Sequence, residues 1–140
     1  MIETGYNRKS EMAAKILFAD DDRLMHRLYQ QHIEHAGFKV VEAGNGREAL
    51  EAAARERPQL AIVDFVMPEI DGLSVVLELQ KTEATRAIPV VLISGDAKCY
   101  QYKKQFLEAG AAAFLTKPFG ASQLLEVIQR LLVCDRAATA

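Results

Sequence analysis

Short apolar runs alternate with helical patterns five times from Lys15 onward, and this alternation constrains the fold more than any other feature. The runs predicted as strands lie at residues 15–19, 38–42, 59–64, 88–93 and 112–116. The segments predicted as helices lie at residues 22–36, 46–56, 72–83, 98–109 and 121–133. The strands show little polar alternation, as expected when helices cover both faces of a sheet. The pattern predicts an α/β fold with a doubly wound, five-stranded parallel sheet and five helices.

Length and charge narrow the range of partners. The chain has 140 residues, the length of one domain, and a net charge of −2 gives no general attraction to nucleic acid or anionic membrane. No apolar run approaches the roughly 20 residues of a spanning helix. Cys99 and Cys134 show neither a disulfide framework nor metal-ligand spacing. We predict a cytoplasmic protein with reduced thiols and no nucleic-acid or membrane partner.

The domain organisation follows from where the periodic pattern begins and ends. Residues 1–14 are polar with weak periodicity, and we expect a loosely ordered extension. Residues 15–133 carry the alternating pattern and form the predicted domain. Residues 134–140 are expected to form a short C-terminal tail, too short for an output domain, so the sequence predicts a stand-alone domain.

Residues that bind metal or phosphate follow four of the predicted strands. They are the pair Asp20-Asp21, then Asp64, Ser94 and Lys117. In an open parallel sheet, ligands bind beyond the carboxyl ends of the strands, where the winding direction reverses. We therefore expect these side chains to converge on one crevice, the carboxylates suited to a divalent cation and the other two to phosphate.

The first acidic cluster, Asp20 to Asp22, has two interpretations. One aspartate at a helix start caps free N–H groups, which contributes about 0.5–2 kcal/mol. Capping needs only one carboxylate, and we assign that role to Asp22. Three neighbouring carboxylates raise one another's pKa unless a cation neutralises them. Asp20 and Asp21 are therefore predicted to face the crevice.

Asp64 ends a buried apolar run and is followed by a turn. Pro68 blocks helix continuation, and Asp71-Gly72 is a turn dipeptide. A carboxylate at such a strand tip is a competent nucleophile toward phosphorus. Mg²⁺ suits the site because it takes one or two carboxylates together with phosphate oxygens. The alternative, an ordinary aspartate at a strand end, stays open for Asp64 taken alone.

Ser94 and Lys117 complete the predicted geometry. A loose phosphoryl-transfer transition state spreads charge over three oxygens, so catalysis consists chiefly of positioning and neutralisation. Metal would take one oxygen, the Ser94 hydroxyl a second and the Lys117 ammonium a third. Pro118 restricts the backbone of Lys117 to an extended form.

Four segments together resemble a known family. They are residues 16–22 (ILFADDD), 63–72 (VDFVMPEIDG), 92–95 (LISG) and 110–119 (GAAAFLTKPF). With them, residues 15–133 resemble the receiver domains of two-component response regulators, of the chemotaxis-regulator type. The resemblance implies a flavodoxin-like fold with strand order 2-1-3-4-5. It also implies a phosphohistidine donor on a sensor histidine kinase or phosphotransfer protein, and a downstream protein target.

The resemblance also implies a role for each site residue. Asp64 would be the phospho-acceptor, and Asp20 and Asp21 the acidic pocket for Mg²⁺, with Mn²⁺ also possible. Val66 would offer its backbone carbonyl to the metal. Ser94 would be the switch hydroxyl, Phe114 the switch aromatic, and Lys117 the phosphate partner, preceding a cis proline. Phosphorylation would change the surface of the fourth helix, fifth strand and fifth helix.

Three residues depart from the family pattern. Phe114 stands where tyrosine is frequent, so a hydroxyl that could bond a partner is missing. Val66 places an apolar side chain beside the acceptor, and Asp96 adds a carboxylate near the same mouth. Both changes bear on the dephosphorylation rate.

Two alternatives come from other classes. A Mg²⁺-dependent phosphatase with an aspartyl-phosphate intermediate usually has a second acid two residues after the nucleophile, where this chain has Val66. A flavin-binding module would need a phosphate loop where Asp20 to Asp22 would repel phosphate. We therefore predict a signalling receiver that catalyses only its own phosphorylation and dephosphorylation, not an enzyme. The histidines of the first helix (His26, His32 and His35) lack ligand spacing and are predicted to be surface residues.

Overall fold

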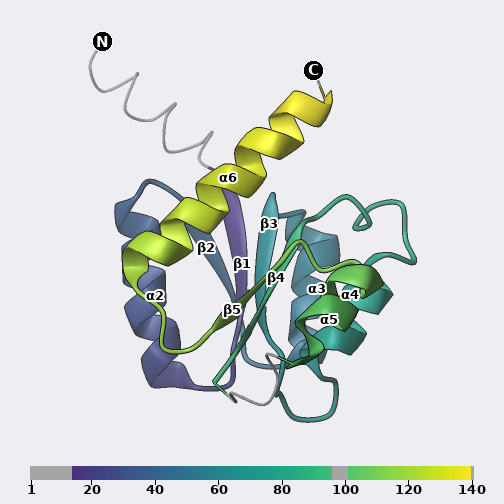
Figure 1. The fold of residues 1–140 in the computed structure, drawn as a ribbon, viewed down its shortest axis with the longest axis horizontal. Helices are drawn as coiled ribbons and strands as arrows, with labels where there is room; N and C mark the ends of the chain where they lie inside the picture. Colours follow the sequence, from purple (N-terminus) through teal and green to yellow (C-terminus); the bar gives the residue numbers. More distant parts are fainter. Residues whose placement is uncertain (1–13, 96–100, 140) are drawn as a thin grey trace.

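A computed structural model describes residues 14–95 and 101–139, which form a central parallel sheet with helices on both sides (Figure 1). The strands are β1 (Lys15–Ala19), β2 (Lys39–Ala43), β3 (Leu60–Asp64), β4 (Val90–Ser94) and β5 (Ala113–Thr116). The helices are α2 (Arg23–His35), α3 (Gly46–Glu56), α4 (Gly72–Leu79), α5 (Lys103–Ala109) and α6 (Ala121–Thr139). The described part of the chain thus alternates strand and helix throughout, as predicted.

The five strands pair in the order β2-β1-β3-β4-β5, and all four pairings are parallel. This confirms the flavodoxin-like doubly wound fold and the strand order 2-1-3-4-5. The chain runs from β1 outward to β2, then returns to the other side of β1 through β3. The winding direction therefore reverses between β1 and β3, the point where such sheets bind ligands.

Each face of the sheet packs against its own helices. On one face, a core of buried side chains from β1, β3, β4 and β5 packs under α2 and α6. On the other face, a second core packs under α3, α4 and α5. Successive strand residues point to opposite faces, so each strand supplies both cores in turn. Strands β3 and β4 are buried throughout and β1 is buried from Ile16 onward, which explains their nearly continuous apolar sequence.

Polar side chains set the starts of three helices. Asp22 Oδ1 accepts hydrogen bonds from the backbone N–H groups of Leu24 and Met25, so its predicted role as the cap of α2 is confirmed. Asn45 caps α3 by accepting from Glu48 N at 2.9 Å, and Asp71 caps α4 by accepting from Ser74 N at 2.8 Å. Each cap satisfies an N–H group that has no partner within its helix.

Two helices end several residues away from their predicted C-terminal bounds. The helix predicted at 72–83 ends at Leu79. The Leu79 carbonyl accepts a hydrogen bond from the Thr85 hydroxyl at 2.6 Å, in place of the backbone N–H that would continue the helix. The helix predicted to end at 133 continues through Thr139, because Arg and Ala favour helix and neither Gly nor Pro interrupts it. Most of the predicted tail is therefore helical.

Two predictions fall partly or wholly on residues that are not described. The helix predicted at 98–109 begins at Lys103, and its first positions, together with Asp96 and Cys99, lie outside the described residues. The predicted N-terminal extension lies outside them except for residue 14. Within the described ranges, no helix has the length and apolar character needed to cross a membrane.

Candidate functional site

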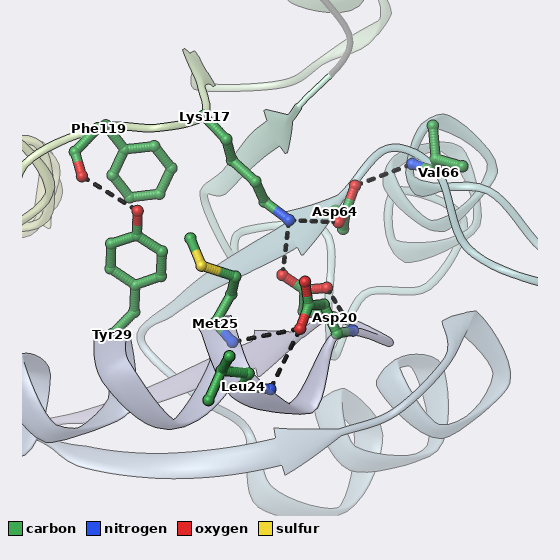
Figure 2. A network of polar contacts seen from close by, with 9 residues as sticks. Asp20, Leu24, Met25, Tyr29, Asp64, Val66, Lys117 and Phe119 are labelled. Carbon is green, nitrogen blue, oxygen red and sulfur yellow. Dashed lines mark hydrogen bonds and ion pairs between the residues drawn. The ribbon is translucent and has the colours of Figure 1, made fainter.

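Three charged side chains from β1, β3 and β5 meet at the carboxyl edge of the sheet. The Lys117 ammonium donates to Asp20 Oδ2 at 2.9 Å and to Asp64 Oδ2 at 2.7 Å (Figure 2). Asp20 and Asp64 are 2% and 6% exposed, so the ion pairs are shielded from water. The convergence predicted from the strand ends is therefore present for these three residues, although 97 and 53 positions separate the partners.

The period of two along a strand brings these side chains to one face. The residues two positions before them, Phe18, Ile62 and Leu115, all belong to the core beneath α2 and α6. Continuing the alternation places Asp20, Asp64 and Lys117 on this same side as the strands end. Three separate strands thus present their charges to a common space.

The acidic cluster is held partly by the start of α2. Asp20 Oδ1 accepts from Asp22 N at 2.9 Å, which fixes the turn between β1 and the helix. Asp21, between them, is exposed. Carboxylate oxygens of Asp20, Asp21 and Asp64 lie within 4.8 Å of one another. Hard oxygen ligands at this spacing could hold a cation such as Mg²⁺, which prefers carboxylates, phosphate oxygens and water.

Both oxygens of Asp64 have partners. Oδ2 accepts from Lys117, and Oδ1 accepts from the backbone N–H of Val66 at 3.0 Å (Figure 2). The turn that follows is tight: Gly72 N donates to Phe65 O at 2.8 Å, and a Cβ on Gly72 would lie 2.6 Å from Asp64 O. Glycine is therefore required where α4 begins against the end of β3.

For both Asp64 and Lys117, burial shifts the pKa in one direction, and their mutual hydrogen bond and opposite charges shift it in the other. Burial raises the pKa of Asp64 and repulsion from Asp20 adds to the rise, outweighing the hydrogen bond and charge of Lys117. Burial by itself lowers the pKa of Lys117, but its hydrogen bonds to Asp64 and Asp20 outweigh that effect and raise it. Lys117 is therefore firmly cationic, whereas Asp64 is a carboxylate held in an unfavourable environment.

The loop after β5 is fastened on both sides of Pro118. Lys117 N donates to Ser94 O at 2.7 Å, and the peptide bond between Lys117 and Pro118 is cis, as the resemblance implied. Beyond the proline, Phe119 O accepts the hydroxyl of Tyr29 at 3.1 Å (Figure 2). Sequence reasoning missed Tyr29, because its helical spacing from Ile33 is that of any core residue.

Ser94 and Phe114 belong to the other face of the sheet. Leu92 and Phe114 both pack in the core under α3, α4 and α5, and alternation assigns Ser94 to the same face. Ser94 is completely buried and Phe114 is 6% exposed. Phe114 packs on Phe106 of α5 with ring centroids 5.4 Å apart. The predicted switch aromatic therefore contacts one of the helices whose surface it is expected to alter.

His26 is buried, so its predicted surface position is wrong. It is 7% exposed and packs edge-on against Phe18, with ring centroids 4.9 Å apart. Its Nε2 lies 3.7 Å from Glu42 Oε1 on the neighbouring edge strand. The helical position of His26, three residues before Tyr29, turns it toward β1, whereas His32 and His35 are exposed.

Fold and site together are those of a signalling receiver: a flavodoxin-like sheet with paired acids and a lysine at its carboxyl edge. The family model for the response regulator receiver domain matches residues 16–129. The chain belongs to the response regulator receiver domain family of two-component systems. Receiver domains bind Mg²⁺ at an acidic pocket, and Asp20, Asp21 and Asp64 form such a cluster here.

Relatives differ in how much of their length the chain matches. It is 32% identical over 122 residues to the alkaline phosphatase synthesis transcriptional regulatory protein PhoP of Bacillus subtilis, covering 86% of this chain and 49% of PhoP. It is 29% identical over 121 residues to the polar-differentiation response regulator DivK of Brucella anthropi, covering 86% of this chain and 98% of DivK. The chain thus spans about half of one relative and nearly all of the other.

A solved structure extends the comparison to three dimensions. The chemotaxis response regulator CheY4 of Vibrio cholerae superposes with a TM-score of 0.78 at 29% sequence identity. The match covers 86% of this chain and 99% of CheY4. The whole receiver fold, with its five strands and five helices, is therefore shared with this chemotaxis regulator.

Proposed function

We propose that this receiver accepts a phosphoryl group on Asp64 from a phosphohistidine donor in a Mg²⁺-dependent reaction. The observation that carries the proposal is the joint contact of Lys117 with Asp64 and Asp20 inside a cluster of three acids. One cation of the protein thus lies beside the nucleophile, and the acids leave room for a second cation from solution.

In the proposed reaction an Asp64 oxygen attacks phosphorus and the bond from phosphorus to the donor imidazole breaks. The imidazole leaves with the bonding electron pair and takes up a proton. Asp20, Asp21, Asp64 and the backbone carbonyl of Val66 would hold Mg²⁺, or Mn²⁺, which supplies charge neutralisation to the phosphoryl oxygens. The Lys117 ammonium would exchange its ion pair with Asp64 for one with a phosphoryl oxygen, and the Ser94 hydroxyl would donate a hydrogen bond to a further phosphoryl oxygen.

The proposed consequence is a change in the surface of α5, β5 and α6. Movement of Ser94 toward the phosphoryl group would alter the space that Phe114 fills against Phe106. Tyr102, just before α5, and Leu107 of α5 are 43% and 40% exposed and offer apolar area to a protein target. Shifting such an equilibrium from 1:99 to 99:1 would take about 5.5 kcal/mol of differential interaction.

The enzyme alternative receives no support from the acceptor loop. Val66 occupies the position where an aspartyl-phosphate phosphatase would carry its general acid, and its side chain is apolar and 58% exposed. Receiver domains are signalling proteins, which agrees with this absence. The proposed donor is a histidine kinase or a phosphotransfer protein, and the proposed target is a downstream protein.

The test is direct phosphorylation with a small donor. The protein is incubated with Mg²⁺ and acetyl phosphate, and intact mass spectrometry is used to find a single acid-stable, base-labile phosphoryl adduct. Asp64→Asn should abolish the adduct, while the matched control Glu69→Gln, an exposed acid of the same loop, should retain it. An adduct that persists in Asp64→Asn, or none on the wild type, would refute the proposal. Steady phosphate release from varied monoesters would instead favour an enzyme.

A further inference from the structure

Two contacts join helix α2 to the loop that carries Lys117. The Tyr29 hydroxyl donates to the Phe119 carbonyl at 3.1 Å, and the two rings stack with centroids 4.5 Å apart and planes 22° apart. Tyr29 and Phe119 are 6% and 7% exposed, so water does not compete for this hydrogen bond. Figure 2 shows the pair beside the network of Lys117, Asp64 and Asp20.

The Tyr29 contact limits where the Lys117 backbone can lie. On one side, Lys117 N is held by Ser94 O at 2.7 Å; on the other, Phe119 O is held by Tyr29. Between these bonds only Pro118 intervenes, and it has no N–H and is exposed. A backbone held on both sides of Pro118 fixes where the Lys117 side chain begins, and so favours the conformers in which its ammonium reaches both carboxylates. The hydrogen bond from Tyr29 to Phe119 O therefore restrains the Lys117 backbone from one side, as the bond to Ser94 O does from the other.

Helix α2 is itself fixed to the acidic cluster. It begins one residue after the Asp22 cap, and Asp22 N donates to Asp20 Oδ1 at 2.9 Å. Asp20 N in turn donates to Ala43 O at 3.1 Å, which anchors the turn on β2. Tyr29, less than two turns into the helix, thus ties the loop of Lys117 to the element that orients Asp20.

We propose that Tyr29, through its hydroxyl, is a positioning residue for Lys117 in phosphoryl transfer to Asp64, an inference that rests on the proposed function. Tyr29 touches none of the reacting groups and acts through the Phe119 carbonyl. Its ring contributes to the core under α2 and α6, as many buried aromatic side chains do. The hydroxyl and the ring are separable, because Tyr29→Phe removes the hydrogen bond and keeps the stacking.

The first measurement is the rate of Asp64 modification by acetyl phosphate at saturating Mg²⁺. Tyr29→Phe should slow it by about three- to tenfold, the effect of losing one buried hydrogen bond at a position that sets geometry. Mg²⁺ affinity, measured by isothermal titration calorimetry, should stay within about twofold, because Tyr29 contacts none of the three acids. Calorimetry is needed because the chain has no tryptophan to report binding.

A matched control separates positioning from loss of stability. Ile33→Val removes one methylene from a completely buried residue of the same helix, one turn beyond Tyr29. It should lower stability and leave the modification rate unchanged. The NMR signal of the Lys117 ε-methylene, assigned by its absence in Lys117→Ala, should shift in Tyr29→Phe and not in Ile33→Val. Equal slowing in the two variants would reduce Tyr29 to a packing residue and overturn the inference.

A double variant tests whether Tyr29 acts through the lysine. In a Lys117→Ala background, Tyr29→Phe should produce no further slowing, because the group that it positions is gone. The same fold-loss in both backgrounds would overturn the inference. Equal rates of modification for the wild type and Tyr29→Phe would refute this inference and leave the proposed function standing. A wild type that is never modified would defeat the proposed function, and this inference with it.

Discussion

The Lys117 ammonium lies 2.7 Å from Asp64 Oδ2, and the same nitrogen lies 2.9 Å from Asp20 Oδ2. The side chains of Lys117, Asp64 and Asp20 are 13%, 8% and 0% exposed, so one largely buried cation is shared between two buried carboxylates. The site is thus short of positive charge in the absence of metal. This imbalance gives each member of the cluster a distinct effect on stability.

Lys117→Ala should destabilise the metal-free protein by about 3–5 kcal/mol, because it leaves two buried carboxylates without the cation that neutralises them. Urea unfolding at pH 7 measures the loss. Mg²⁺ should restore part of it, since cation binding to the folded state adds to stability. The control is Lys81→Ala, which breaks an exposed pair with Glu78 and should cost about 0–1 kcal/mol. Similar losses for the two variants would contradict the shared buried cation.

Asp64→Asn should be more stable than the wild type at pH 7 without metal. The folded pKa of Asp64 is raised above its usual value of 3.8, so its contribution is fully present below that value. The contribution is lost as pH rises through the raised folded pKa. Wild-type stability, measured by urea unfolding relative to Asp64→Asn, should therefore fall with rising pH in this window and stay level above it. A relative gain for the wild type over the same window would show that the sign is wrong.

Asp21 and Asp22 are adjacent acids that should behave in opposite ways. Asp21→Asn should weaken Mg²⁺ binding by about tenfold or more, since the charge count of the ligand set determines affinity. Its effect on unfolding should be small, because the side chain is exposed. Asp22→Ala removes the cap of α2 and should cost about 1 kcal/mol while Mg²⁺ binding changes little. Calorimetry and urea unfolding on both variants check the pair, and equal effects on metal binding would contradict it.

Gly72→Ala should destabilise the protein by about 1–3 kcal/mol through overpacking. The added Cβ would lie 2.6 Å from Asp64 O and 2.9 Å from Leu92 Cδ2. Because Asp64 O is a backbone atom, the end of β3 would have to shift to relieve the clash. Because the clash pushes on the end of β3, phosphorylation of Asp64 should also slow. Gly120→Ala is the matched control, since its Cβ would meet nothing within 4 Å. If both alanines are tolerated equally in urea unfolding, the close approach at Gly72 is not a constraint.

Local sequence signals predicted the features of the fold that depend only on residues close together in the sequence. The bounds of β1 and α3 agree with prediction, and so does the Asp22 cap. The cis bond before Pro118 was implied by the family resemblance and not by local signals. The predictions failed where a distant contact decides. Helix α4 stops at Leu79 because the Thr85 hydroxyl takes its carbonyl, and His26 is buried because it faces Phe18. The Thr85 contact leaves no trace in the periodicity of its own segment, whereas the spacing of His26 from Tyr29 and Ile33 does place it on the buried face of α2.

The sequence by itself determined the alternation of strand and helix and put an acid or a lysine just where β1, β3 and β5 end, because these depend on local propensity and period. Only the tertiary structure decided that Lys117 bonds Asp20 and Asp64 together, and that Tyr29 fastens the loop beside it. Those contacts depend on strand order and on the path of a loop relative to a helix 90 residues away. Such long-range geometry is set by the packing of the two cores, which no single segment specifies.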